Sequence, residues 1–287
     1  MFQAICMKFL LKKCAIIIKY KSGVIGGKIM NRQIGAQYFT IRKRITDIDS
    51  FDAACKKVAD IGYKIVQISG VSLEAKEMRE ILDKYGLKCV VTHKKFDDFK
   101  NDIDAVIDYN RTLGCDFCGV GITPLEYAVS TETVSDYIKE INKICEVLKA
   151  ENMYYGCHNH TMEYAKFDGK TIMDRFLEET DPEVFKFIAD THWLQMSGMT
   201  PQDELKRLGN RVKIVHFKDL GINAQEWKVP VMKEVGQGNL DWDKIIKVCD
   251  EIGVEYAIVE QDKNHIDDDP FKALELSYEF LKTKGFY

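Results

Sequence analysis

The sequence predicts a single-domain (β/α)8 barrel of the α/β class, a TIM barrel, over residues 31–287. Eight short apolar runs alternate with longer segments of helical period, which is typical of a parallel sheet covered by helices. No stretch rich in proline, glycine or serine divides the chain into two domains. A doubly wound open sheet is the alternative, but it would be expected to carry GxGxxG after its first strand, and this chain lacks that motif.

The eight apolar runs are each about six residues long, which is an ordinary length for a strand. They cover residues 33–39, 64–69, 88–93, 117–122, 153–158, 185–190, 212–217 and 255–260. Eight parallel strands are the number that a closed barrel of this type needs.

Helix boundaries support the same architecture. Over 132–150 the apolar residues recur at helical spacing, so one stripe faces inward, and Thr131 is predicted to cap this helix. Asp269 and Pro270 are predicted as the N-cap and the first residue of the last helix. Glycines stand where four helices are predicted to end, at Gly62, Gly86, Gly114 and Gly253.

The composition is that of an ordinary globular protein and predicts no membrane span. Hydrophobic residues make up 46% of the chain and charged residues 30%. The 9 cysteines are irregularly spaced, which favours reduced thiols in the cytoplasm over a disulfide framework. Cys115 and Cys118 form one CxxC pair, which we interpret as packing residues because a single pair cannot make a four-ligand zinc site.

Residues 1–30 are predicted to be an N-terminal extension outside the core. They hold six lysines and no acid, which leaves 35 basic against 45 acidic side chains in the rest of the chain. Lysines interrupt the apolar stretch and no A-x-A-like site follows, so a signal peptide is disfavoured. Residues 26–30, GGKIM, can be back-translated as a purine-rich ribosome-binding site ahead of ATG, so we favour a miscalled start and Met30 as the first residue.

Histidines and carboxylates gather where the predicted strands end. Packing alone would spread histidines over helices and loops, yet five of the 6 histidines lie at strand ends. In a barrel these ends meet at the face that forms the active site. The residues concerned are His93, His158, His160, Asp190, His192, His216 and Glu260.

Such groups from several strands could surround one divalent cation. Asp190, His216 and Glu260 are the first candidates, because each closes an apolar run and can project into the mouth of the barrel. A mixed set of nitrogen and oxygen ligands suits manganese, iron, cobalt or zinc better than calcium. Ordinary hydrogen bonding at the strand ends is the alternative for each residue.

Several motifs resemble the xylose isomerase-like barrels known as sugar phosphate isomerases/epimerases, a superfamily that also includes endonuclease IV and inosose dehydratase-like enzymes. The resemblance spans nearly all of 31–287. It implies a divalent metal, most commonly manganese with cobalt, iron, zinc or magnesium as alternatives, held by Asp190, His216 and Glu260. The motifs are IGAQYFTIR (34–42), THKK (92–95), YGCHNHTMEY (155–164), ADTHW (189–193), VHFKD (215–219), EVGQGNLDW (234–242), IVEQD (258–262) and DPFKALELSYEFLKTKGF (269–286).

The fifth strand departs from the ketose epimerases of this superfamily, which end that strand in a glutamate that is both ligand and base. Here His158 takes that place and is the predicted fourth ligand, in an HNHxxE pattern that resembles dehydratase-like members. His160 and Glu163 follow it as predicted catalytic residues, together with Glu260. His93, Trp193 and Lys218 are predicted to contact the substrate.

The resulting functional prediction is a metal-dependent sugar isomerase or epimerase that removes a proton next to a carbonyl through an enediolate. A lyase that eliminates a β-substituent from an inosose or a 3-oxo-glycoside is the alternative.

A nuclease of the endonuclease IV type is disfavoured, because the acidic chain has no basic run for a phosphate backbone. A non-catalytic sugar-binding subunit stays open, as do a homo-oligomer and a partner subunit. No phosphate-binding loop follows the seventh strand, which weakly favours a non-phosphorylated sugar.

Overall fold

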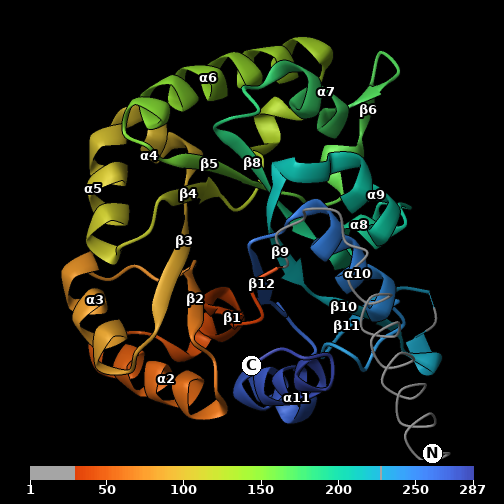
Figure 1. The fold of residues 1–287 in the computed structure, drawn as a ribbon. Helices are drawn as coiled ribbons and strands as arrows, with labels where there is room; N and C mark the ends of the chain where they lie inside the picture. The colour runs from red at the N-terminus through yellow and green to blue at the C-terminus, as the bar shows by residue number, and fades with distance from the viewer. Residues whose placement is uncertain (1–29, 227) are drawn as a thin grey trace, which may run out of the picture.

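The computed structural model describes residues 30–226 and 228–287, and in them eight parallel strands close into a barrel (Figure 1). The order around the barrel is β1-β12-β9-β8-β5-β4-β3-β2, so the first and last strands pair and complete the ring. The strands are β1 (Ile34–Gln37), β2 (Ile65–Ile68), β3 (Lys88–Lys94), β4 (Phe117–Val120), β5 (Tyr154–His158), β8 (Phe185–Asp190), β9 (Val212–Phe217) and β12 (Tyr256–Val259). The predicted fold class is therefore confirmed.

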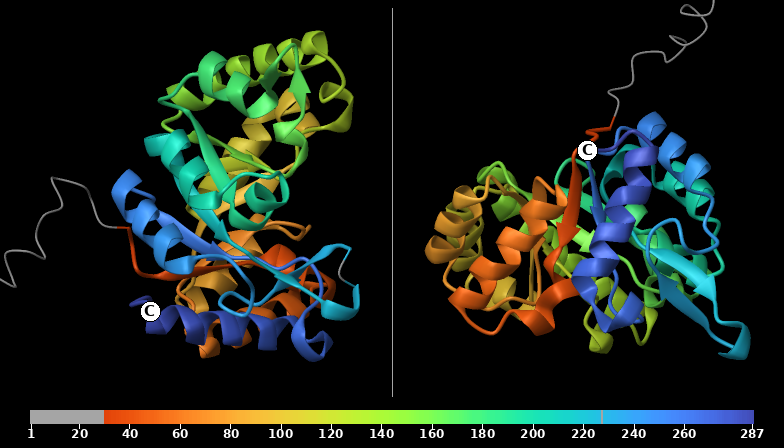
Figure 2. Two further views of the ribbon diagram at one scale, coloured as in Figure 1. Left: turned by 90° about the vertical axis from the view of Figure 1, so that its right-hand side faces the viewer. Right: turned by 90° about the horizontal axis from the view of Figure 1, so that it is seen from below.

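Helices form an outer ring around these strands, as Figures 1 and 2 show. Each packs an apolar stripe inward, and together with the strands these stripes make a continuous core. The helices are α2 (Ile48–Ile61), α3 (Ala75–Lys84), α4 (Phe96–Asn101), α5 (Ile103–Leu113), α6 (Thr131–Ala150), α7 (Ile172–Glu179), α8 (Thr191–Met196), α9 (Pro201–Leu208), α10 (Trp242–Ile252) and α11 (Pro270–Thr283).

All eight predicted strands are present, and the largest difference lies in the first. The strand predicted over 33–39 ends at Gln37, because the Gln37 side chain accepts a hydrogen bond from the N–H of Phe39 at 3.2 Å. The following segment, Tyr38–Arg44, is a 3₁₀ helix. Local side-chain capping thus turns the chain at the mouth of the barrel.

The predicted cap of α6 is off by one residue. Ser130, and not Thr131, is the N-cap, because the Ser130 hydroxyl accepts from the N–H of Thr133 at 3.3 Å. Thr131 is the first helical residue, and its hydroxyl donates to Asp168 at 2.5 Å. The predicted start of α11 is correct, with Asp269 accepting from the N–H of Phe271.

The predicted packing role of the CxxC pair agrees with the structure, in which Cys115 and Cys118 are buried. None of the helices in the described part of the chain is long and apolar enough to cross a membrane. Residues 1–29 of the predicted N-terminal extension lie outside the described residues, so the proposed start at Met30 stays a prediction.

Two antiparallel hairpins are added to the barrel in the described residues, and the shorter one, β6 (Lys166–Phe167) with β7 (Lys170–Thr171), follows β5. Directly after β9 the chain forms an antiparallel hairpin of β10 (Asp219–Ile222) and β11 (Pro230–Lys233), which projects from the barrel in Figure 2. Asp219, at the root of this hairpin, is fully buried. Its carboxylate accepts five hydrogen bonds, from the backbone N–H groups of Leu220, Gly236, Gly238 and Leu240 and from the indole N–H of Trp242.

Candidate metal centre

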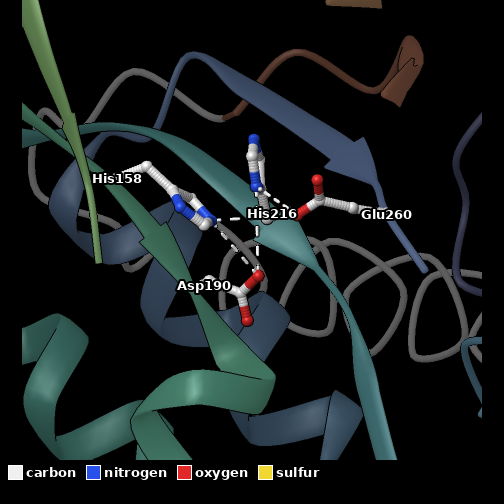
Figure 3. Close-up of side chains that lie close together, drawn as sticks. All are labelled: His158, Asp190, His216 and Glu260. Atoms are coloured by element: carbon white, nitrogen blue, oxygen red, sulfur yellow. Dashed lines mark hydrogen bonds and ion pairs between the residues drawn. The ribbon is translucent and has the colours of Figure 1, made fainter. Parts of the chain in front are cut away.

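Four strand ends bring the four predicted ligands together (Figure 3). His158 ends β5, Asp190 ends β8, His216 lies in β9 and Glu260 follows β12. One ligand atom from each lies within 4.8 Å of the others, and all four residues are buried. These residues come from strands that neighbour one another in the order β5, β8, β9 and β12, which explains how residues far apart in sequence meet.

Hydrogen bonds to the backbone and to one glutamine orient both imidazoles. His158 donates from Nδ1 to the carbonyl oxygen of Gly121 at 3.0 Å, which leaves its Nε2 facing Asp190 Oδ2 at 3.4 Å. His216 donates from Nε2 to Gln67 Oε1 at 2.7 Å, which leaves its Nδ1 facing Glu260 Oε2 at 2.9 Å. Each imidazole therefore turns its other ring nitrogen toward a carboxylate, an arrangement that a shared cation would stabilise.

The charge of the cluster also fits a divalent cation. Lys218 is buried, and its Nζ lies 3.2 Å from Asp190, 3.1 Å from Glu260 and 2.8 Å from Asp262. With Asp190 and Glu260 ionised, these groups leave the site net negative when His158 is neutral. Because buried charge is costly unless it is balanced, one divalent ion on the free nitrogens and carboxylates would complete the set.

Burial and neighbouring charges oppose each other in setting the protonation of this cluster. Burial alone would raise the pKa of Glu260, but Lys218 and the adjacent histidines hold it well below its usual range. Burial likewise opposes ionisation of Asp190, but Lys218 and His158 lower its pKa to about 2. Both carboxylates are therefore ionised at neutral pH, as cation binding requires.

A cavity of about 230 Å³ opens beside the cluster, and several predicted residues line it. His93, His158, His160, Lys218 and Glu260 are among its walls, with Phe39, Ser69, Gly121, Ile122 and Asp262 completing them. Burial lowers the pKa of His160 to about 3, so its imidazole is neutral. A substrate in this cavity would meet three imidazoles, one ammonium and two carboxylates.

Glu163 and Trp193 lie behind this cavity, not in its wall. Glu163 is fully buried, and its Oε2 accepts from the backbone N–H of His160 at 2.7 Å. The Trp193 ring lies beside the His160 ring, with centroids 5.1 Å apart. Glu163 therefore contacts the cavity wall through His160, and Trp193 contacts it through His160 and through Lys218, whose Nζ lies 5.3 Å from the centroid of the indole ring. Their predicted roles in catalysis and substrate contact stay predictions.

Gln67 and Asp262 belong to the site but were not predicted. Gln67 is fully buried in β2 and joins two histidines, since its Nε2 donates to His93 Nε2 at 2.8 Å while its Oε1 accepts from His216. A glutamine inside an otherwise apolar run, KIVQIS, is the one signal that could have marked it. Asp262 closes the EQD triplet, and its partner Lys218 could not be inferred from spacing.

One protein-family model matches most of the chain. The family model for "Xylose isomerase-like TIM barrel" matches residues 55–284. The chain belongs to this family. Three of the members compared below are named as an isomerase/epimerase or as dehydratases, so the family includes enzymes.

Curated relatives and solved structures agree on the fold and differ in their named activity. Inosose dehydratase from Clostridium perfringens is 24% identical over 218 residues, which cover 69% of this chain and 70% of that protein. A sugar phosphate isomerase/epimerase from Parabacteroides distasonis matches with a TM-score of 0.72 and 20% identity over 90% of this chain and 94% of its own. The probable 3-DHS dehydratase from Bacillus anthracis matches with a TM-score of 0.69 and 16% identity, covering 87% of this chain and 98% of its own.

One structural relative bears on the cofactor. A xylose isomerase-like TIM barrel protein from Mycobacterium smegmatis, solved in complex with magnesium, matches with a TM-score of 0.68 and 14% identity over 88% of this chain and 95% of its own. At this identity the match concerns the fold alone. The cluster of His158, Asp190, His216 and Glu260 could hold a metal, and the identity of that metal, predicted as manganese, belongs to the proposal below.

Proposed function

We propose that this protein is a divalent-metal-dependent lyase that eliminates water from a polyhydroxylated ketone, a sugar derivative or cyclitol. The observation that carries the proposal is the buried cluster of two imidazoles and two carboxylates beside a cavity. The named activities of the Clostridium perfringens and Bacillus anthracis relatives support elimination as the reaction. His158, Asp190, His216 and Glu260 would hold the metal, with manganese as the expected ion.

Such a cation would act as a Lewis acid on the substrate carbonyl and make the neighbouring C–H more acidic. Glu260 lines the cavity and is the proposed base that takes this proton. As the carbon–carbon double bond forms, the C–O bond to the β-hydroxyl breaks, and the departing hydroxide takes up a proton to leave as water. His160 lines the same cavity and is the proposed group that passes this proton, in a position fixed by Glu163.

The same first step would serve an isomerase or epimerase, which is the second candidate. Epimerisation needs proton-transfer groups on both faces of one carbon. The carboxylates that line the inner cavity within the described residues, Glu260 and Asp262, both follow β12 and therefore stand on one side of it. Ketose epimerases end the fifth strand in a glutamate, whereas this chain has His158 at the end of β5. A pair of glutamates that could serve the two faces of the carbon is therefore absent, which favours elimination over epimerisation.

The test is proton exchange followed by NMR in D₂O, with inososes, ketoses and 3-oxo-glucosides as the panel. Protein loaded with manganese is expected to exchange the C–H next to the carbonyl and to release a product lighter by one water molecule. Protein treated with EDTA is the control and should do neither. A product with the mass of the substrate would instead identify an isomerase or epimerase, and the absence of exchange with every panel member would contradict the proposal.

Gln67→Met is expected to weaken manganese binding by about 10–100-fold, the usual effect of losing a partner that orients a ligand. Methionine keeps the side-chain length but cannot accept the hydrogen bond from His216 Nε2, so the imidazole is free to rotate. Isothermal titration with manganese measures the change. Equal affinities of the Gln67→Met variant and the unmodified protein would show that Gln67 does not orient His216.

A further inference from the structure

A second, larger hollow adjoins the inner cavity. Its volume is about 530 Å³, and its walls come from the loops that follow β2, β3 and β4, together with Tyr109 of α5. His93, Gly121 and Ile122 line both the inner cavity and this groove. The two spaces therefore meet at these three residues, and a ligand held at the cluster could extend into the groove.

The inner cavity is small for a ligand-binding pocket. Ligand pockets usually measure about 300–1,000 Å³. The inner cavity of about 230 Å³ lies below this range, whereas the groove of about 530 Å³ lies within it. A substrate of one ring would use the inner cavity alone and leave the larger space unfilled.

The wall of the groove is apolar where a ligand would enter. Ile122, at the junction, is 47% exposed and lines the groove together with Val71, Leu73, Phe96, Val120 and Pro124. Leu125 and Val129 follow in the chain, outside the lining of the groove, and are 69% and 64% exposed. A concentration of exposed apolar surface beside a hollow is typical of a ligand-binding groove.

Three of the five charged side chains that line the groove are already engaged. Lys94 places its Nζ 3.1 Å from the centroid of the Tyr109 ring, a cation–π contact. Asp97 pairs with Lys100 at 3.8 Å, and Asp98 accepts from the backbone N–H of Lys95 at 3.0 Å. Two lysines and three acids line the groove, so it has no excess of positive charge for a phosphate group.

We propose that the groove binds a neutral second ring that is attached to the reacting ring, so that the substrate has two rings, as in a glycoside or a disaccharide. This inference rests on the proposed function, because the inner cavity must hold the reacting ring. The apolar wall around Ile122 would cover one face of the second ring, and the hydroxyl of Ser72 would lie at its edge. A second sugar and an aromatic aglycone share the required chemistry.

The experiment compares the binding of one-ring and two-ring compounds, which requires no turnover. Dissociation constants for methyl β-glucoside, phenyl β-glucoside and cellobiose are measured by NMR titration of manganese-loaded protein. We expect the two-ring compounds to bind at least about tenfold more tightly, which corresponds to about 1.4 kcal/mol. Tighter binding of phenyl β-glucoside than of cellobiose would identify an aromatic second group, and the reverse order a second sugar.

The Ser72→Trp variant tests whether the second ring lies in the groove, because Ser72 is exposed and lines the groove but not the inner cavity. The indole would fill the groove, so the preference for two rings should disappear while methyl β-glucoside binds as before. Thr283→Trp, at the exposed end of α11, is the matched control and should keep the preference. Equal affinities in the unmodified protein, no binding of the two-ring compounds, or an unchanged preference in Ser72→Trp would overturn the proposal. If the two-ring compounds bound more tightly but no ketone exchanged a proton, the proposed function would be contradicted. The proposal that the groove binds a second ring would still stand.

Discussion

The Glu260→Gln variant is expected to lose most of its bound metal and to slow proton exchange by about 10²–10⁴-fold, the usual contribution of a positioned base. The substitution keeps the shape of the side chain but removes one of the negative charges that balance a divalent cation. It also places an amide opposite His216 Nδ1, which now lies 2.9 Å from Glu260 Oε2. Metal analysis of the purified protein and exchange in D₂O measure the two effects separately.

Glu234→Gln is the matched control for this variant. Glu234 is also buried, but it accepts hydrogen bonds from the backbone of Ile266 and from Gln261, away from the cluster. This variant should therefore keep its metal and its exchange rate. Full metal content in Glu260→Gln would show that Glu260 is not a ligand, and full exchange would show that it is not the base.

Asp219→Asn is expected to lower the free energy of unfolding by about 3–5 kcal/mol, the effect of removing a buried charge from its hydrogen-bond partners. The Asp219 carboxylate uses both of its oxygens, with Oδ2 accepting from Gly236, Gly238 and Trp242 and Oδ1 accepting from Leu220 and Leu240. An amide has one oxygen, so its NH₂ group would face buried N–H donors. Urea unfolding followed by circular dichroism measures the loss.

Asp241→Asn is the control for Asp219→Asn. Asp241 is the exposed N-cap of α10 and accepts from the N–H of Lys244 at 3.2 Å. Asparagine caps helices about as well as aspartate, so this variant should stay within about 0.5 kcal/mol of the unmodified protein. If the two variants unfolded at the same urea concentration, the five hydrogen bonds of Asp219 would not contribute to stability as argued.

The barrel and the cluster could be predicted because both leave local signals. Each strand is a continuous apolar run, since strands of a parallel barrel are buried on both faces. Asp190, His216 and Glu260 interrupt or end such runs, and in a barrel the ends of all strands meet. His158 required the resemblance to known barrels, because spacing alone did not separate it from His160.

The remaining parts of the site depend on contacts that no local pattern encodes. Lys218 and Asp219 are adjacent in sequence, and this adjacency alone would suggest an ordinary ion pair between them. Successive side chains of an extended chain point in opposite directions, so Lys218 reaches the cluster while Asp219 faces the loop around Gly236. The groove was not predicted, because its walls come from three loops and Tyr109, and their juxtaposition requires the fold.

The four cluster residues span more than one hundred positions of the chain, and only the closed barrel assembles them. An unfolded chain offers the same imidazoles and carboxylates one at a time, with little affinity for a cation. Binding of a cation would therefore favour the folded state by mass action, by about 2.7 kcal/mol when the free ion is at one hundred times its dissociation constant. The metal supply of the cell would then set how long this protein survives heat and proteolysis, in addition to whether it turns over its substrate.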